Sequence, residues 1–474
     1  MLSSSVARRR VLIAVLATSA SCACIAQTAG PSLVARVDER VELLSVVFRL
    51  AGNPEYNMSP LSSYTADIDS YFAAFKDHPA IVLARQLAKD KGVGFDRPMT
   101  LAVSLSQPPD LAPVVALGNS DWGEDNGVRF LRLLRDFYRE TKFQNFFAAH
   151  QAMYQLAESR FREVLSGMDL TWYPRFYGET PKARYHVILG LNNGGANYGP
   201  RVVLPDGSEE LYSVMGCWTK DASGAPTFNA DYLPTLIHEF NHSFVNPLVD
   251  EHKTEFAVAD RVYGPVADKM QAMAYPTSEV MVQESLVRAA VILYFESRGA
   301  GSDKLRRMVI REQANGFVWM DELCDLLRQY QSARTRYPTW RSYIPVIVEF
   351  YRVLGDHIAE KIAGFNQKCA HVAGIQPFAN HAENVSADTI ELIVTFDKPL
   401  DPDHGYSINN GPQGGYPISG PPEFLQGGRS LKLTLSLKPD QSYSFVLTPL
   451  AFGSPDGYPL ESYTVVFKTS ARPQ

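Results

Sequence analysis

The chain has 474 residues, which at roughly 100–200 residues per domain is room for two or three domains. Hydrophobic residues make up 45% and charged residues 20%, which is typical of folded globular proteins and excludes a disordered or fibrous chain. The net charge is -6 and no long basic run occurs, so we expect no nucleic-acid partner, because such partners need a phosphate-neutralising surface.

The N-terminal segment has the order of a secretory signal peptide. Three consecutive arginines that begin at Arg8 precede an apolar run from Val11 to Ala17, and small residues follow through Ala26. We therefore predict that residues 1–26 are removed and that the mature protein is exported, to the periplasm, the cell surface or the medium. No later segment approaches about 18 uninterrupted apolar residues, so we expect no transmembrane span in the mature chain.

Cysteines are few after this segment. Cys217, Cys324 and Cys369 allow at most one disulfide, and no spacing supports the pairing of Cys324 with Cys369. The sequence therefore predicts neither a disulfide-stapled scaffold nor a cysteine-based metal site.

The pattern from about residue 33 to 216 indicates helices followed by short strands. Apolar side chains recur at helical spacing between Val128 and Leu165, which predicts amphipathic helices that pack in a core. The β-rich runs are 185–191, 201–204 and 210–215, and turn-forming residues separate them. This order predicts a small antiparallel sheet.

A metal-binding pattern follows the predicted sheet. The sequence His238-Glu239-Phe240-Asn241-His242 matches His-Glu-x-x-His. Asp231 is a suitable N-cap, Pro234 fits a first helical turn, and helices usually end before a proline such as Pro247. Residues 232–246 are therefore predicted to form one helix with the motif at its centre.

The helix gives each polar residue of the motif a role. His238 and His242 lie one turn apart on the same face, so both imidazoles can reach one metal ion. Glu239 is rotated by about 100° and can instead hold a metal-bound water as a general base. The residue types and their spacing thus favour zinc-assisted hydrolysis.

A catalytic zinc ion needs a third protein ligand. The metzincin spacing would place a histidine at position 248, which is Leu248, so that class is excluded. A helix predicted from Ser278 to Ser297 carries Glu284 on an otherwise apolar face, where an unpaired carboxylate is costly. Glu284 is therefore our preferred ligand and Glu279 the second candidate, while Arg288 either braces Glu284 or forms an ordinary ion pair on the helix.

These residues resemble those of two known protein families. His238-Glu239-x-x-His242 followed 42 residues later by Glu284 resembles the gluzincin class of zinc metallopeptidases. The strings 238–248 and 284–289 also resemble an exported bacterial family of unknown function over most of residues 33–340. The resemblance implies a zincin fold, a Zn²⁺ cofactor and a peptide or protein substrate.

The same resemblance implies two further parts of the site. One is a sheet-edge strand that pairs with an extended peptide, supplied here by 185–192 or by the turn through Asn197 and Tyr198. The other is a tyrosine or histidine that steadies the oxyanion. Tyr263, Tyr275 and His252 lie in plausible range, and no spacing selects one of them.

The sequence pattern changes again near residue 370, to short runs of alternating apolar and polar residues at 389–396, 430–435, 442–447 and 463–467. In the first run Ile390, Leu392, Val394 and Phe396 are expected to share one strand face. Such a pattern predicts an all-β sandwich. The segment 390–400 also resembles the Ig-like domains of bacterial exported and surface-layer proteins, which implies an accessory module.

The sequence as a whole predicts an α+β protein with three parts. These are the signal peptide at 1–26, a mainly helical zincin-like metallopeptidase domain at 30–370 and an Ig-like β-sandwich at 375–474. We expect an exported zinc metallopeptidase with His238, His242 and Glu284 as ligands and Glu239 as the base. The alternatives are a zinc hydrolase of another amide or ester, and a catalytically inactive exported binding protein.

Overall fold

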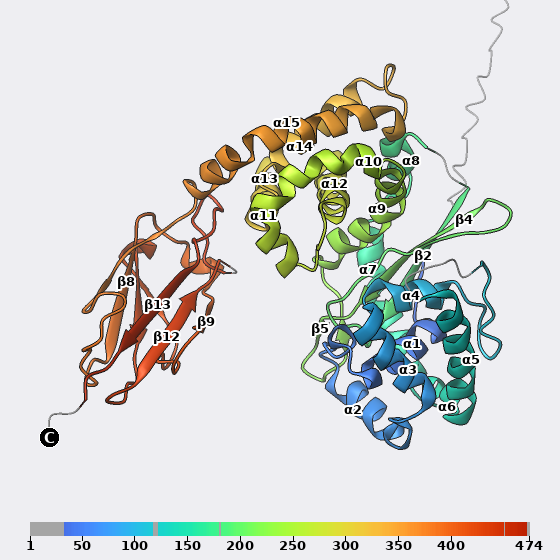
Figure 1. Ribbon diagram of the computed structural model, residues 1–474, viewed down its shortest axis with the longest axis horizontal. Helices are drawn as coiled ribbons and strands as arrows, with labels where there is room; N and C mark the ends of the chain where they lie inside the picture. Colours follow the sequence, from blue (N-terminus) through green and yellow to red (C-terminus); the bar gives the residue numbers. More distant parts are fainter. Residues whose placement is uncertain (1–32, 117–121, 180–181, 450, 472–474) are drawn as a thin grey trace, which may run out of the picture. The chain divides into compact units, whose positions relative to one another are not determined.

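The computed structural model describes residues 33–116, 122–179, 182–449 and 451–471, and it is an α+β structure, as predicted (Figure 1). The predicted signal peptide lies outside the described residues. Among the described helices, none combines the length and the apolar character that crossing a membrane requires.

The first part of the chain is helical, which confirms the prediction from apolar spacing. Helix α1 (Glu39–Ala51) begins at Asp38, whose side chain accepts a hydrogen bond from the backbone N–H of Arg40, and it ends at Gly52 in the left-handed conformation. Most of α1 is buried, so it forms the centre of this region. The other elements are η1 (Pro54–Tyr56), α2 (Ser62–Tyr71), η2 (Ala73–Phe75), α3 (Pro79–Lys91), α4 (Asp96–Val103), α5 (Glu124–Glu140), α6 (Phe143–Ala149), α7 (Gln151–Ser166) and α8 (Trp172–Tyr177).

The sheet of this region is mixed, so the prediction of an antiparallel sheet is wrong. Its order is β1 (Ala35–Arg36), β2 (Ala183–Gly190), β4 (Glu209–Gly216) and β3 (Arg201–Val203). Only β3 and β4 form the predicted hairpin, whereas β2 pairs in parallel with both β1 and β4. The reason is that the chain reverses direction twice between β2 and β4 and places β3 on the far side of β4.

Helix α9 (Tyr232–Glu251) carries the histidine motif, and it is longer than predicted. Pro247 lies inside it, at the cost of one backbone hydrogen bond, because Leu248 and Val249 continue the buried apolar face. Helix α9 packs against α12 (Ser278–Ser297), whose predicted bounds are confirmed (Figure 1). The remaining elements up to residue 366 are β5 (Thr219–Lys220), β6 (Pro226–Thr227), α10 (Lys253–Phe256), η3 (Ala257–Ala259), α11 (Asp260–Ala272), α13 (Ser302–Ala314), α14 (Met320–Ser332) and α15 (Trp340–Asn366).

Two antiparallel sheets follow α15, in the orders β10-β11-β8-β7 and β13-β12-β9. Side chains from both sheets form one buried cluster, as expected for two packed layers. Leu392, Val394 and Phe396 belong to this cluster, but Ile390 lies before its strand and is 67% exposed, so its predicted place on the same face is wrong. The elements are β7 (Val372–Gln376), β8 (Glu391–Phe396), η4 (Pro402–His404), β9 (Ile408–Asn410), β10 (Glu423–Leu425), η5 (Gln426–Gly428), β11 (Ser430–Thr434), β12 (Ser442–Leu447) and β13 (Tyr463–Lys468).

The cysteines of the described residues are Cys217, Cys324 and Cys369, and all three are buried free thiols. Burial raises the pKa of Cys217 to about 11 and that of Cys324 to about 12. Because the thiolate is the reactive form, these thiols serve packing.

Candidate metal site

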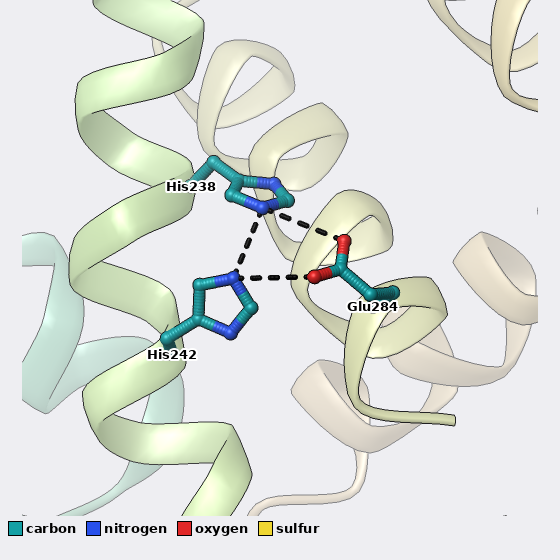
Figure 2. Close-up of side chains that lie close together, drawn as sticks. All are labelled: His238, His242 and Glu284. Carbon is teal, nitrogen blue, oxygen red and sulfur yellow. Dashed lines mark hydrogen bonds and ion pairs between the residues drawn. The ribbon is translucent and has the colours of Figure 1, made fainter. Parts of the chain in front are cut away.

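The structure brings together the three residues that the sequence predicts as ligands. Nε2 of His238 and Nε2 of His242 on α9 are 3.0 Å apart, and the Glu284 carboxylate on α12 lies 3.6 Å from the first nitrogen and 3.5 Å from the second. Figure 2 shows the two rings and the carboxylate directed toward one another. Ligands held at about 2.0–2.1 Å by a tetrahedral zinc ion are separated by about 3.3 Å, so this spacing fits a zinc site.

All three side chains are nearly buried. The exposed fractions are 17% for His238, 15% for His242 and 10% for Glu284. Burial lowers the pKa of His238 well below its usual value, and the nearby His242 and Arg288 lower it further. His238 is therefore held as the neutral imidazole, which is the form that binds metals.

A neighbour on the same helix contacts the second ring nitrogen of His242. Its Nδ1 lies 3.1 Å from Oδ1 of Asn246, one turn further along α9. An amide oxygen only accepts hydrogen bonds, so this contact favours the tautomer with the proton on Nδ1, in which the lone pair of Nε2 faces His238 and Glu284. Asn246 is not among the residues predicted from the sequence, although its spacing of four residues from His242 is a usable signal.

Glu239 does not join the three ligands. Its side chain is buried, and burial raises the pKa of its carboxyl group well above the usual value, with a further contribution from the charge of Glu284. The backbone of Glu239 is in close contact with Gly199, where a Cβ atom would lie 2.1 Å from the Glu239 carbonyl oxygen. The glycine-containing segment before β3 therefore passes directly against the motif.

This segment forms the edge of the mixed sheet. Tyr198 pairs with Val214 of β4, with N–H···O distances of 3.0 and 2.8 Å. The first predicted alternative for the edge strand, 185–192, is wrong, because β2 is paired on both sides. The second alternative, through Asn197 and Tyr198, does lie at the edge, and neighbours of a paired residue such as Gly199 direct their backbone groups away from the partner strand.

The three oxyanion candidates differ in their surroundings. The hydroxyl of Tyr275 accepts a hydrogen bond of 2.7 Å from Arg288. Burial raises the pKa of Tyr275, and the charge of Glu284 raises it further. Tyr263 instead donates to the Tyr275 carbonyl oxygen, and His252 pairs with Glu255. Of the three, Tyr275 is the one that borders the ligand cluster.

Glu279, the second candidate for the third ligand, lies outside the ligand cluster. It is in the first turn of α12 and faces Asp250 near the end of α9. Burial raises the pKa of Asp250 to about 6, and the charge of Glu279 adds to that effect. Among the residues that the structure describes, the His-His-Glu group formed with Glu284 is thus the arrangement that can hold a metal ion.

Residues 33–350 match the family described as Domain of unknown function (DUF4932), and the chain belongs to this family. No curated protein matches the chain. Among solved structures, surface layer protein SbsC, domains 1-6, is 14% identical with a TM-score of 0.17, and the match covers 51% of this chain and 34% of that chain. The N-terminal part of the bacterial S-layer protein SbsC is also 14% identical at a TM-score of 0.17, over 53% of this chain and 60% of that one.

This chain therefore covers only about a third of the first SbsC structure. At this TM-score the likeness carries no argument about fold or function. The roles of the site residues rest on their geometry and on the sequence motif.

Proposed function

We propose that this member of the DUF4932 family is an exported zinc-dependent metallopeptidase. In this proposal His238, His242 and Glu284 hold the metal, and Glu239 acts as the general base. The observation that carries it is the convergence of two imidazole nitrogens and one carboxylate from two packed helices at distances of 3.0 to 3.6 Å.

The ligand set supports zinc in a catalytic role. Two imidazoles and a carboxylate are typical zinc ligands, and three protein ligands leave one tetrahedral position open, unlike the four ligands of structural sites. A zinc ion bound there would polarise a substrate carbonyl and lower the pKa of a water molecule.

The role of Glu239 follows from its place on α9. It is adjacent to His238 in sequence but rotated away from the ligand face, so its carboxylate stays available to accept a proton from a water molecule beside the ligands. The burial of Glu239 favours this transfer, because little bulk water can compete for the proton.

The sheet edge supports a peptide as the substrate. An extended peptide binds by adding a strand to an exposed edge, where the backbone supplies the hydrogen bonds. The edge segment through Asn197 and Gly199 lies against the backbone of Glu239. A peptide paired with this segment would therefore run beside the general base. In this proposal the two-sheet unit after residue 370 is an Ig-like accessory module.

The proposal is tested with the mature chain, zinc and a broad peptide library. We expect about one zinc ion per chain by elemental mass spectrometry, lost in His238→Ala and in Glu284→Ala. Cleavage of the library should be abolished in Glu239→Gln, which should still bind zinc because that side chain is not a ligand. Zinc binding without cleavage of any peptide would contradict the proposal, and a panel of esters and other amides would then separate the hydrolase alternative from an inactive binding protein.

A further inference from the structure

Arg288 lies one turn after Glu284 on α12, and it is buried beside the ligand cluster. Its side chain is 16% exposed, and its Nε lies 3.4 Å from Oε2 of Glu284. Among the described residues, neither of these two buried atoms has a hydrogen-bond partner. Burying a guanidinium group is costly unless its N–H groups find hydrogen-bond partners. The contacts of Nη1 and Nη2 must therefore offset this cost.

Two residues from outside α12 hold the other end of the guanidinium group. Nη1 donates a hydrogen bond of 2.7 Å to Glu312 on α13, and Nη2 donates one of 2.7 Å to the hydroxyl of Tyr275. The ring of Phe317 lies 5.2 Å from the guanidinium carbon. The planar group is therefore fixed in position, with Nε 3.4 Å from Oε2 of Glu284.

Because Arg288 lies beside only one oxygen of Glu284, the two carboxylate oxygens have different neighbours. Oε1 lies 3.5 Å from Nε2 of His242, and within the described part of the chain no arginine or lysine forms an ion pair with it. Oε2 lies 3.6 Å from Nε2 of His238 and also faces Arg288. A carboxylate can bind a metal through one oxygen or through both, and binding through both would add a fifth ligand and crowd the position that water or substrate needs.

We propose that Arg288, anchored by Glu312 and Tyr275, is a positioning residue that retains Oε2 of Glu284, so that only Oε1 binds the metal and one coordination position stays open. The inference rests on the proposed function. Glu312 also balances the charge of Arg288, so the arginine supplies a fixed donor without adding net positive charge beside a cation.

The test uses the mature chain loaded with Co²⁺, whose visible absorption is more intense in four-coordinate sites than in five-coordinate ones. The main variant is the double substitution Arg288→Met with Glu312→Gln, which removes one positive and one negative charge together. We expect an intense spectrum for the wild type and loss of that intensity in the double variant, together with a fall in the rate of peptide cleavage of about 10–100-fold.

A matched control removes a similar ion pair from the same helix. Arg328 on α14 binds Glu296 near the end of α12, with its Nε 3.0 Å from Oε2. The double substitution Arg328→Met with Glu296→Gln should leave the cobalt spectrum unchanged. If the Arg288 double variant does not fold, Tyr275→Phe removes one anchor with little change in volume and should shift the spectrum in the same direction.

The outcomes separate this inference from the proposed function. A wild-type chain that binds no metal overturns both. A wild type that binds metal and cleaves peptides, with equally intense cobalt spectra in all folded variants, overturns the role of Arg288 alone. A five-coordinate spectrum in the wild type also overturns it, because Glu284 would then already bind through both oxygens.

Discussion

Nδ1 of His242 lies 3.1 Å from Oδ1 of Asn246, so a residue outside the His-Glu-x-x-His motif determines which nitrogen of a predicted ligand is free. The contact fixes both the tautomer and the orientation of the ring before any metal binds. The candidate metal site therefore extends along α9 beyond the second histidine.

Asn246→Leu should weaken zinc binding by about 10–100-fold, because the ring of His242 loses the acceptor that orients it. Asn246→Asp keeps an oxygen acceptor at the same place and should retain the affinity. Competition with a chromophoric chelator measures both constants. Equal zinc affinity in the leucine variant and the wild type would show that the contact does not orient the ring.

Zinc should stabilise the folded chain by linkage, because the three ligands are assembled only in the folded state. At a free zinc concentration 100 times the dissociation constant, the free energy of unfolding should rise by about 2.7 kcal/mol. Urea unfolding with and without zinc measures this gain, and His242→Ala should abolish it. A gain of the same size in that variant would place the stabilising metal elsewhere.

Gly199→Ala should reduce activity and stability, because the added Cβ would lie 2.1 Å from the Glu239 carbonyl oxygen and either the sheet edge or α9 would have to move. The expected loss of stability is about 1–3 kcal/mol, typical of overpacking. Gly195→Ala is the matched control in the same segment, since no atom lies within 4 Å of its Cβ position. Thermal unfolding and peptide cleavage of the two variants should therefore differ, and identical behaviour would contradict the contact.

The parts of the structure that were predicted from the sequence depend on local patterns. The bounds of α12 follow from its apolar run, and the proximity of His238 to His242 follows from helical spacing alone. Glu284 was predicted as a ligand because a carboxylate on an apolar helix face needs a partner. A pattern within one helix thus indicated a contact with a residue far away in the sequence.

The errors and omissions arise from contacts that local patterns do not encode. The parallel pairing of β2 with β4 depends on where the chain places β3, and the turn residues specify only the β3–β4 hairpin. Pro247 was expected to end its helix, but tertiary burial of Leu248 and Val249 outweighs the lost hydrogen bond. Glu312 reaches Arg288 from another helix, so no spacing along the chain pointed to it.

A buried carboxyl group far from the motif in sequence should make stability depend on pH. Glu42 on α1 is fully buried, and it accepts hydrogen bonds from the Tyr64 hydroxyl at 2.5 Å and from the backbone N–H of Leu191 at 2.8 Å. Burial raises the pKa of Glu42 from 4.5 to about 7, although both hydrogen bonds oppose the shift. The folded state therefore binds this proton more tightly than the unfolded state does.

The sign of the effect follows from linkage. The contribution of Glu42 to stability is complete below about pH 4.5 and is lost as the pH rises through about 7, because the folded state must then bury a charge. The loss is about 3 kcal/mol, since one pKa unit corresponds to about 1.4 kcal/mol.

Glu42→Gln removes the titration and keeps both an acceptor for Leu191 and a polar partner for Tyr64. Urea unfolding of both proteins with a chelator present, at pH 5 and pH 8, should show the wild type losing about 2.5 kcal/mol more than the variant. Parallel changes in the two proteins would mean that Glu42 is ionised in the folded state across this range.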